Sequence, residues 1–537
     1  MSILMGPALS FRGCTDGSWR LTAIVVFAGD AEKISVDGIN SKTEIILDTE
    51  IWAVHRFNIT AKMKKDTQAI QYSVGDRAFE VTIPAIGQAP TIAYTSCNGF
   101  SSLKLMKGVK DKNALWKVMA RRHGLQDIAY EPGMPDTAPA TPYHLLLQGG
   151  DQVYADAMWE TVASMKAWNE ASWSDGNAAP LTAAMQTELD AFFFDLYLSR
   201  WSQPEVARML ARIPSIAMWD DHDLIDGWGS YPPERQNCAV FGGIWKAASK
   251  AFAVFQQHLK ADEHRPGTIT KAEAGWWQQP VTQEERSGAF SLGYVVGPLA
   301  ILAIDMRSQR TEKSQVVSES HWKEAFDWLD AQRDISHLLL ASSIPVVYPG
   351  FDTIEKLLGI FPGHQDLEDD LRDHWRSQPH KGERLRLIYR LLDLSKRGIR
   401  ATIVSGDVHV AALGAIESRR EQAAGSENVI NQLISSAIVH PGPGAVVLFA
   451  LQNLFDSDEE IDRGLFGRMM AFPNSKAKFL GGRNYLSIEP DESRRLWCNW
   501  FVEGQDYPFK KVIHPLDPPP SATARRQPPR RVRASAD

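Results

Sequence analysis

The sequence contains few cysteines. Only Cys14, Cys97, Cys238 and Cys498 occur among its 537 residues, and no two of them form a CxxC pair. This spacing excludes a disulfide-stapled scaffold and a zinc knuckle. A reducing compartment is the usual one for such a chain.

The sequence also lacks a secretory signal and a bilayer-spanning run. Its first residues carry neither a basic segment nor a continuous apolar segment, and the apolar residues 445–451 are too few to cross a membrane. We therefore expect a cytoplasmic protein with no membrane partner.

An excess of basic residues is absent as well. The chain has 58 Lys and Arg residues against 65 Asp and Glu residues, which gives a formal net charge of -7 at pH 7. Such a balance carries no nucleic-acid-binding signature. With 44% hydrophobic and 23% charged residues, the composition is that of a globular protein, and it leaves the oligomeric state open.

The length predicts more than one structural unit. Short β-type runs separated by turns fill residues 1–88 and predict an N-terminal β-sandwich domain. From residue 91 to residue 514, apolar strands alternate with helical stretches, which is the pattern of an α/β (α+β) catalytic domain. Residues 515–537 are rich in proline and arginine and predict a disordered tail, with an interaction tail as the alternative.

The strands and helices of the catalytic region can be placed from their hydrophobic patterns. We expect strands at residues 91–95, 144–147, 213–218, 299–304, 337–340 and 401–404, and helices at residues 113–122, 181–198, 244–258 and 381–396. Each predicted strand ends in polar residues.

The most charged of these strand ends is Trp219-Asp220-Asp221-His222-Asp223, directly after the predicted strand 213–218. Because α/β folds build their sites at the carboxyl ends of strands, three carboxylates and an imidazole there would share one small region. Such a density of charge indicates a metal.

Two more strand ends follow the same pattern. A glycine turn delivers Asp151 after strand 144–147, and Gly406 precedes Asp407 after strand 401–404. His409 stands two residues beyond Asp407, so both side chains point to one side of an extended segment. A single Gly-Asp is more often a turn or cap residue, but three together favour a polynuclear metal site. Asp, His and Tyr donors suit iron, manganese, zinc or calcium.

At these residues the chain resembles the PhoD-like alkaline phosphatases, a branch of the calcineurin-like metallophosphatase superfamily. The match runs from about residue 94 to residue 440. The motifs of this branch read here as Ser96-Cys97, Gly150-Asp151-Gln152-Val153-Tyr154, Trp219 to Asp223, Asp305-Met306-Arg307-Ser308-Gln309-Arg310 and Gly406-Asp407-Val408-His409. The resemblance implies a four-layer α/β/β/α catalytic domain.

The chain departs from the wider superfamily as this branch does. Cys97 stands in place of the first Asp, Tyr154 in place of a later Asp, and Asp407 in place of a His. Asp221 takes the position of an Asn ligand. A histidine usual after a later strand has no counterpart, since residues 342–345 read Ser-Ser-Ile-Pro.

The resemblance implies a metal-ligand set and its ions. The predicted ligands are Cys97, Asp151, Tyr154, Asp221, Asp407 and His409. Thiolate and phenolate donors favour ferric iron at one position. The resemblance implies the same iron together with calcium, and another divalent pair of manganese, zinc or cobalt is the alternative. Without this context, Cys97 would be read as a buried, inert thiol.

The predicted reaction is in-line attack of a metal-bound hydroxide on phosphorus. His222 would donate a proton to the leaving oxygen, and Asp221 would act beside it as a ligand. We expect Asp220 and Asp223 to orient His222 and raise its pKa.

Arginine residues would bind the substrate. Arg307 and Arg310, three residues apart, are expected to clamp a phosphate, with a structural salt bridge to Asp305 as the alternative. His440 would either enter the site or pack a loop.

The predicted function is therefore that of a phosphoric ester hydrolase of the alkaline phosphatase or phosphodiesterase type, acting on a small-molecule phosphate ester. A phosphotriesterase on the same site is one alternative. A metal-stabilised binding protein without turnover is another.

Overall fold

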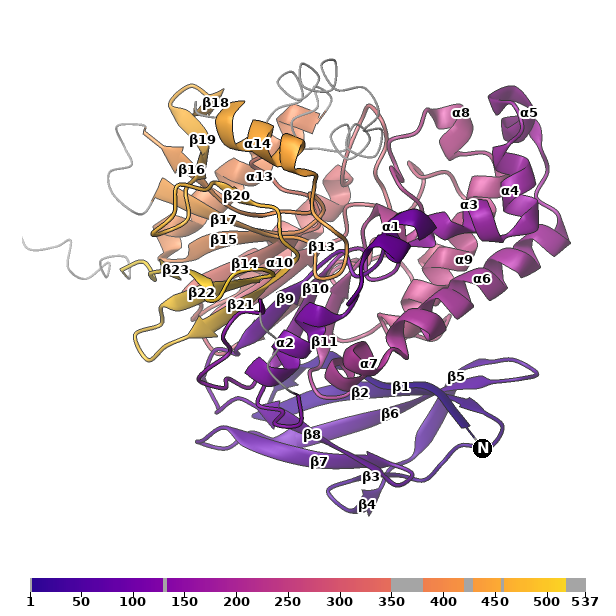
Figure 1. The fold of residues 1–537 in the computed structure, drawn as a ribbon, viewed down its shortest axis with the longest axis horizontal. Coiled ribbons are helices and arrows are strands. Elements are labelled where there is room, and N and C mark those ends of the chain that lie inside the picture. The colour runs from indigo at the N-terminus through magenta and orange to yellow at the C-terminus, as the bar shows by residue number, and fades with distance from the viewer. Residues whose placement is uncertain (1, 129–132, 349–379, 420–427, 455–457, 518–537) are drawn as a thin grey trace, which may run out of the picture.

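The computed structural model describes residues 2–128, 133–348, 380–419, 428–454 and 458–517. Most of the predicted tail at 515–537 lies outside the described residues. Two large sheets and one small sheet form the β-structure, and helices cover the outer faces of the large sheets (Figure 1).

The first large sheet draws on both ends of the chain. Its order is β23-β22-β21-β9-β10-β11-β1-β2-β6-β5. The three central strands β9, β10 and β11 are parallel, with Leu145 opposite Ile92 and Leu146 opposite Ser215. The bounds are β1 (Ser2–Thr15), β2 (Ser18–Ala28), β5 (Thr43–Asp48), β6 (Ala53–Lys62), β9 (Ile92–Thr95), β10 (Leu145–Gly149), β11 (Ser215–Met218), β21 (Asn484–Pro490), β22 (Leu496–Val502) and β23 (Phe509–Ile513).

The N-terminal strands form two facing layers. The small sheet has the order β4-β3-β7-β8, and Tyr72 on β7 packs against Phe57 on β6 with ring centroids 6.1 Å apart. The other layer is continuous with the first large sheet, since Ser10 on β1 pairs in parallel with Ser215 on β11. The N-terminal region therefore has sandwich layers but shares a sheet with the catalytic region. The small-sheet bounds are β3 (Ile34–Val36), β4 (Ile39–Asn40), β7 (Gln68–Val74) and β8 (Arg77–Ile83).

The second large sheet has the order β12-β13-β14-β15-β17-β16-β19-β18, with β20 paired to β16. Strands β13, β14, β15 and β17 run parallel, so their carboxyl ends meet at one edge. The bounds are β12 (Leu292–Val296), β13 (Leu299–Ile304), β14 (His337–Ser342), β15 (Arg400–Ser405), β16 (Ala411–Ser418), β17 (Val429–Ser435), β18 (Glu459–Asp462), β19 (Leu465–Met470) and β20 (Phe479–Leu480).

The side chains of β13 show how the layers stack. Leu302 and Ile304 join the apolar cluster that includes Trp322 of α10 (Glu319–Ala331). Ile301, one position away, joins the central cluster between the sheets. Because successive strand residues face opposite ways, the second sheet packs a helix layer on one face and the first sheet on the other. This confirms the four-layer arrangement. α13 (Lys381–Asp393) lies with α10 on the outer face.

Longer helices cover the outer face of the first sheet. In α6 (Ala183–Trp201), Leu189, Phe193, Tyr197 and Trp201 recur every fourth residue and are all buried. Thr182 caps its first turn by accepting from the Met185 N–H. Figure 1 shows α6 beside α7 and α9 on one side of the molecule. The bounds are α2 (Ala114–Arg122), α7 (Pro204–Leu210) and α9 (Ala239–Phe255).

Short helices complete the described fold, and each strand and helix predicted from residue 91 onward is present. None of the described helices combines the length and hydropathy needed to cross a bilayer. The short helices are α1 (Leu103–Gly108), α3 (Met158–Thr161), α4 (Ala163–Asn169), α5 (Trp173–Ala178), α8 (Pro233–Gln236) and α14 (Ala445–Leu454).

Candidate metal centre

The polar residues that follow the parallel strands converge at one edge of the two sheets. Cys97 follows β9, Asp151 follows β10, Asp221 follows β11, Arg307 follows β13 and Asp407 follows β15. All five are buried, with 6% exposure or less. The sheets therefore bring together motifs that lie more than 300 residues apart in the sequence, as in the Cys97 Sγ to Asp407 carbonyl contact, |i−j| = 310.

Four predicted ligands occupy left-handed backbone conformations. Their φ values are 53° for Cys97, 55° for Asp151, 70° for Asp407 and 52° for His409. Non-glycine residues adopt this region rarely, and such strain concentrates at functional sites because the surrounding structure must hold it. Here the turns aim the side chains back into the site.

Glycine is required before Asp151. Gly150 has a φ of +110°, and a Cβ at this position would lie 2.6 Å from the Asp220 Cβ. Only glycine allows the β10 loop to approach the β11 loop so closely. The Gly-Asp pattern noticed in the sequence thus has a steric cause.

Three carboxylates form the acidic part of the site. Asp151, Asp220 and Asp221 each offer an oxygen, and these oxygens lie within 4.8 Å of one another. Burial, followed by the nearby Asp220, raises the pKa of Asp151 well above its usual range. Burial also raises the pKa of Asp220 to about 6. Like charges at this spacing need a compensating cation.

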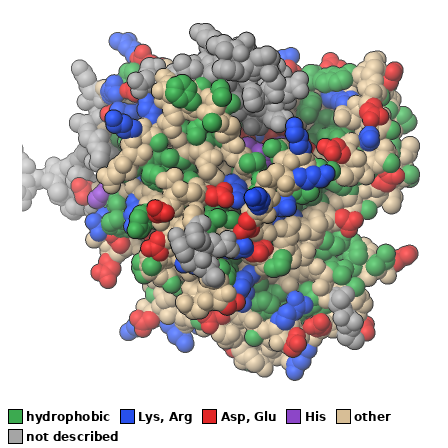
Figure 2. All heavy atoms as spheres, viewed as in Figure 1, with side chains coloured by type: hydrophobic (Ala, Val, Ile, Leu, Met, Phe, Trp, Pro, Cys, Tyr) green, Lys and Arg blue, Asp and Glu red, His purple; other side chains and the backbone are tan. Residues whose placement is uncertain are grey.

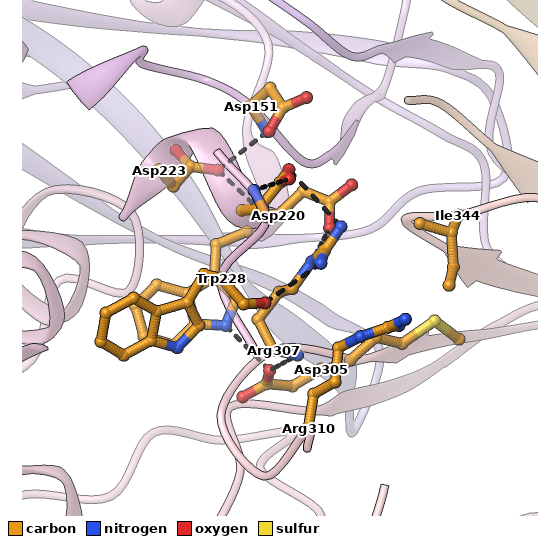
Figure 3. A network of polar contacts seen from close by, with 12 residues as sticks. Asp151, Asp220, Asp223, Trp228, Asp305, Arg307, Arg310 and Ile344 are labelled. Atoms are coloured by element: carbon orange, nitrogen blue, oxygen red, sulfur yellow. Dashed lines mark hydrogen bonds and ion pairs between the residues drawn. The ribbon is translucent and has the colours of Figure 1, made fainter. Parts of the chain in front are cut away.

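Arg307 supplies part of that compensation. Its Nε forms an ion pair with Asp220, its Nη2 lies 3.4 Å from the Asp221 Oδ1, and its Nη1 donates to the Trp228 carbonyl at 3.2 Å. Figure 3 shows the guanidinium pointing toward Asp220. Because Arg307 contacts both acids, the structure favours support of the acids over direct contact with substrate.

Asp305 does not form the salt bridge considered as the alternative. Its Oδ1 instead accepts from the backbone N–H groups of Arg307 and Ser308, each at 3.0 Å, and from the Trp219 indole at 2.8 Å. Arg310 is also buried, and its Nε donates to the Ser230 hydroxyl at 3.3 Å. Asp305 therefore shapes the loop that carries both arginines.

The expected role of Asp223 is wrong. Rather than orienting His222, its carboxylate accepts from the backbone N–H groups of Asp151, Gln152, Val153 and Asp220 at 2.8 to 3.3 Å. A Gln256 amide adds a fifth bond at 3.1 Å. Asp223 ties the β10 loop to the β11 loop, and burial still raises its pKa to about 7.

His222 is oriented by Asp156. The His222 Nδ1 lies 2.6 Å from the Asp156 Oδ2, while the other oxygen of Asp156 accepts from the Asp226 N–H at 2.8 Å. Burial alone would lower the pKa of His222, but the Asp156 and Asp221 carboxylates outweigh it and raise the pKa well above its usual range. The expected orientation by Asp220 is also wrong, since Asp220 pairs with Arg307.

The opposite side of the site consists of a thiol and stacked rings. Cys97 Sγ lies 3.4 Å from the Asp151 Oδ2 and 3.0 Å from the Ser436 hydroxyl. Tyr154 joins Cys97 in one small buried cluster. The Tyr154 ring stacks on His222 at 4.3 Å and on His440 at 5.6 Å.

His440 lies in the site rather than in a distant loop. Its ring stacks on His409 with centroids 3.9 Å apart. Its Nδ1 lies 2.9 Å from the Pro441 carbonyl. Burial lowers the pKa of His440 to about 4, and burial together with His440 lowers that of His409 well below its usual range. Both imidazoles are therefore held neutral, the form that binds a metal.

The residues fit a metal centre. Among the described residues, the Asp151 Oδ1 and the His409 Nδ1 are buried polar atoms without a hydrogen-bond partner. Burial and Asp151 raise the pKa of Cys97 well above its usual range. A cation would stabilise the thiolate and satisfy these atoms. Asp221, His222 and Asp226 form a second group with ligand-sized spacing.

Two sheets flanked by helices, with an acid-rich edge of this kind, define the metallophosphatase class. The chain belongs to the family described as PhoD related phosphatase, whose sequence model matches residues 62–362 and 357–457.

The chain is similar to a curated protein and to a solved structure that each cover most of its length. The uncharacterized protein YGR266W of Saccharomyces cerevisiae is 27% identical over an alignment 530 residues long, which covers 84% of this chain and 72% of that protein. A solved structure of PhoD superposes with a TM-score of 0.53 at 12% identity, covering 96% of this chain and 90% of that one. At this identity the superposition shows a shared fold.

Proposed function

We propose that the strand-end centre hydrolyses phosphate mono- or diesters with a metal pair. The observation that carries this proposal is the placement of three carboxylates within 4.8 Å of one another, beside an oriented histidine, with one of them, Asp151, 3.4 Å from the buried Cys97 thiol. Bound cations would acidify a water molecule and neutralise charge on the phosphoryl oxygens.

The donor types divide the proposed ligands into two groups. Cys97 and Tyr154, with sulfur and phenolate donors, suit ferric iron, whereas Asp151 and Asp221 suit calcium or another divalent cation. Asp151 lies between the groups, within 3.4 Å of Cys97 and in the acidic cluster. We therefore propose Asp151 as the bridging ligand, with Asp407 and His409 completing the set.

His222 is the proposed proton donor. Because its Nδ1 is held by Asp156, its Nε2 is the nitrogen left to face a substrate. The carboxylate keeps the imidazole protonated to higher pH, as an acid for a leaving alkoxide requires. Asp156 is thus the positioning residue for this step.

The two arginines take different roles in this proposal. Arg307 holds Asp220 and Asp221 in place, because its guanidinium contacts both. Arg310 remains the proposed phosphate contact. The substrate would be a small-molecule phosphate ester and the location cytoplasmic.

The test is hydrolysis of matched p-nitrophenyl phosphate mono-, di- and triesters before chelation, after chelation and after return of metal. We expect metal-dependent turnover of the mono- or diester. Asp221→Asn should lower it about 10³-fold. Asp327→Asn makes the same chemical change at an exposed position of α10, away from the site, and should leave it unchanged. A preference for the triester would favour the phosphotriesterase alternative. Metal retention without turnover of any ester would favour a binding protein and overturn the proposal.

A further inference from the structure

The helix α14 exposes an apolar face. Its ten residues carry no charge. Leu451 is buried, and Val447 and Leu448 pack partly against the same apolar cluster. On the other face, Phe449 is 70% exposed and Val446 is 53% exposed. The two exposed side chains are three residues apart and therefore share one face of the helix.

A basic segment lies on another side of the same site. In α1 (Leu103–Gly108) no residue is buried. The exposed cations Lys104 and Lys107 of this helix, and Lys110 just after it, alternate with apolar side chains. The one acid of this segment, Asp111, is already paired with Lys117 at 2.7 Å. The segment is therefore a local cationic, amphipathic surface on a protein whose net charge is -7.

Both surfaces lie close to His440, one in space and one along the chain. The Ser101 hydroxyl, just before α1, lies 3.2 Å from the His440 Nε2, and α14 begins five residues after His440. Figure 2 shows hydrophobic side chains over α14 and Lys and Arg side chains near α1 on the same face of the molecule. A partner bound to both surfaces would therefore lie near His440, which stacks on His409 of the metal centre.

We propose that α14 and the α1 segment form a docking surface for anionic lipid membranes. Exposed Phe449 and Val446 would enter the boundary between headgroups and acyl chains, and the lysines would contact the anionic headgroups. The patch offers two large apolar side chains, less than the area of about 800 Å² per partner that a stable protein interface buries. A bilayer needs only shallow insertion combined with opposite charge.

The proposed surface would bind to the face of a membrane and would not span it. The sequence expectation of no membrane partner rests on the lack of a spanning run, which the described helices also lack. A peripheral contact requires no spanning run.

Vesicle flotation of the full chain tests the docking surface directly. The probes are neutral phosphatidylcholine vesicles and vesicles that also contain phosphatidylserine. We expect binding to the anionic vesicles, with weaker binding at raised salt because the lysine contribution is screened. Phe449→Asp and the pair Lys104→Glu with Lys107→Glu should each weaken binding about tenfold or more.

The matched controls make the same changes on the N-terminal sheets. Ile39→Asp replaces a residue that is 74% exposed on β4, and Lys33→Glu with Lys65→Glu reverses two exposed cations. These variants should bind vesicles like the unaltered chain. All variants should unfold at the same temperature as the unaltered chain, which reports correct folding without relying on turnover.

Two results would overturn the inference. One is anionic vesicle binding that Phe449→Asp and the lysine pair leave unchanged relative to the controls. The other is the absence of vesicle binding, whether or not sedimentation shows a dimer that Phe449→Asp dissociates. A dimer of that kind would assign α14 to contact between two copies of the chain. Binding is measured without turnover, so failure of the proposed hydrolysis leaves this test intact.

Discussion

The two ends of the parallel strands bury polar groups in opposite ways. At the amino ends, His123 Nδ1 accepts from the Tyr143 N–H at 3.0 Å and His144 Nδ1 accepts from the Thr91 N–H at 2.9 Å. Burial lowers the pKa of both histidines to about 4, so they remain neutral. At the carboxyl ends, burial raises the pKa of Asp151, and its Oδ1 has no hydrogen-bond partner.

The difference shows that burial alone does not mark a site. A buried neutral ring whose acceptor is satisfied stabilises the fold, whereas clustered acids and a thiol with unsatisfied oxygens need an added cation. The same contrast holds within Trp219 to Asp223. Asp223 accepts five hydrogen bonds and stabilises the loops, whereas Asp221 belongs to the acidic cluster that needs a cation.

Asp221→Asn should have the largest effect. The substitution keeps the shape of the side chain and the Gly227 contact at 2.8 Å but removes a negative charge from the acidic cluster. We expect a loss of about 10³-fold in kcat with the folded state intact, by analogy with the loss of one charge-stabilising group. Steady-state kinetics and thermal unfolding check this together. An active Asp221→Asn variant would place the chemistry elsewhere.

Asp223→Asn should act on stability. In the unaltered protein, the carboxylate accepts hydrogen bonds from backbone N–H groups. An amide in its place would turn its own N–H donor toward some of these N–H groups and leave them without an acceptor. We expect the free energy of unfolding to fall by about 3 kcal/mol. Denaturant unfolding measures it, with Asp327→Asn as the control. Unchanged stability would contradict the structural role of Asp223.

Asp156→Asn should lower activity by about 100-fold at alkaline pH, the upper range for loss of an orienting carboxylate. Asp156 raises the pKa of His222, so its removal makes the imidazole lose its proton at lower pH. The alkaline limb of the kcat profile should therefore move to lower pH while folding is kept. An unchanged pH profile would show that His222 does not donate the proton.

Acid should lower the stability of the fold through His123 and His144, the histidines at the amino ends of the strands. Their folded-state pKa of about 4 lies below the ordinary value of 6.5, so the unfolded chain binds protons that the folded chain does not. The contribution of each histidine to stability is retained above pH 6.5 and falls by about 3 kcal/mol between pH 6.5 and pH 4. Because Asp220 and Asp223 have raised pKa values, they gain protons in the folded chain over the same range and contribute to stability with the opposite sign. Proton NMR of the two imidazole rings therefore measures their titration directly, and rings that gain a proton near pH 6.5 in the folded chain would refute neutral burial.

Arg310→Lys should have the smallest effect. If Arg310 contacts phosphate, loss of its planar fork should raise KM about tenfold and leave kcat nearly unchanged. Kinetics on the preferred ester distinguish the two parameters. A fall in kcat alone would instead assign Arg310 to support of the site loops.

Much of the catalytic region was predictable from sequence because its signals are local. An apolar strand followed by glycine and aspartate identifies the β10 and β15 ends, and the structure brings Asp151 and Asp407 to the same buried edge. The N-cap residue Thr182 and the apolar residues that recur every fourth position in α6 likewise indicate a helix.

Non-local contacts were not predictable. The parallel pairing of β1 with β11 was not predictable, because it joins residues 205 positions apart and because Gly6, Pro7 and Gly13 interrupt the pattern of β1. Asp156 was overlooked because it follows Asp151 in a loop without a recognisable motif. Its partner His222 is 66 residues away. The only available signal was its presence beside Tyr154.

Metal content of the purified chain tests the central claim most directly. We predict that elemental analysis finds more than one metal ion per chain, iron among them, and that Cys97→Ser and Asp221→Asn each lower the content while Asp327→Asn does not. A metal-free chain that still hydrolyses phosphate esters, or a metal content that neither site variant changes, would contradict the account.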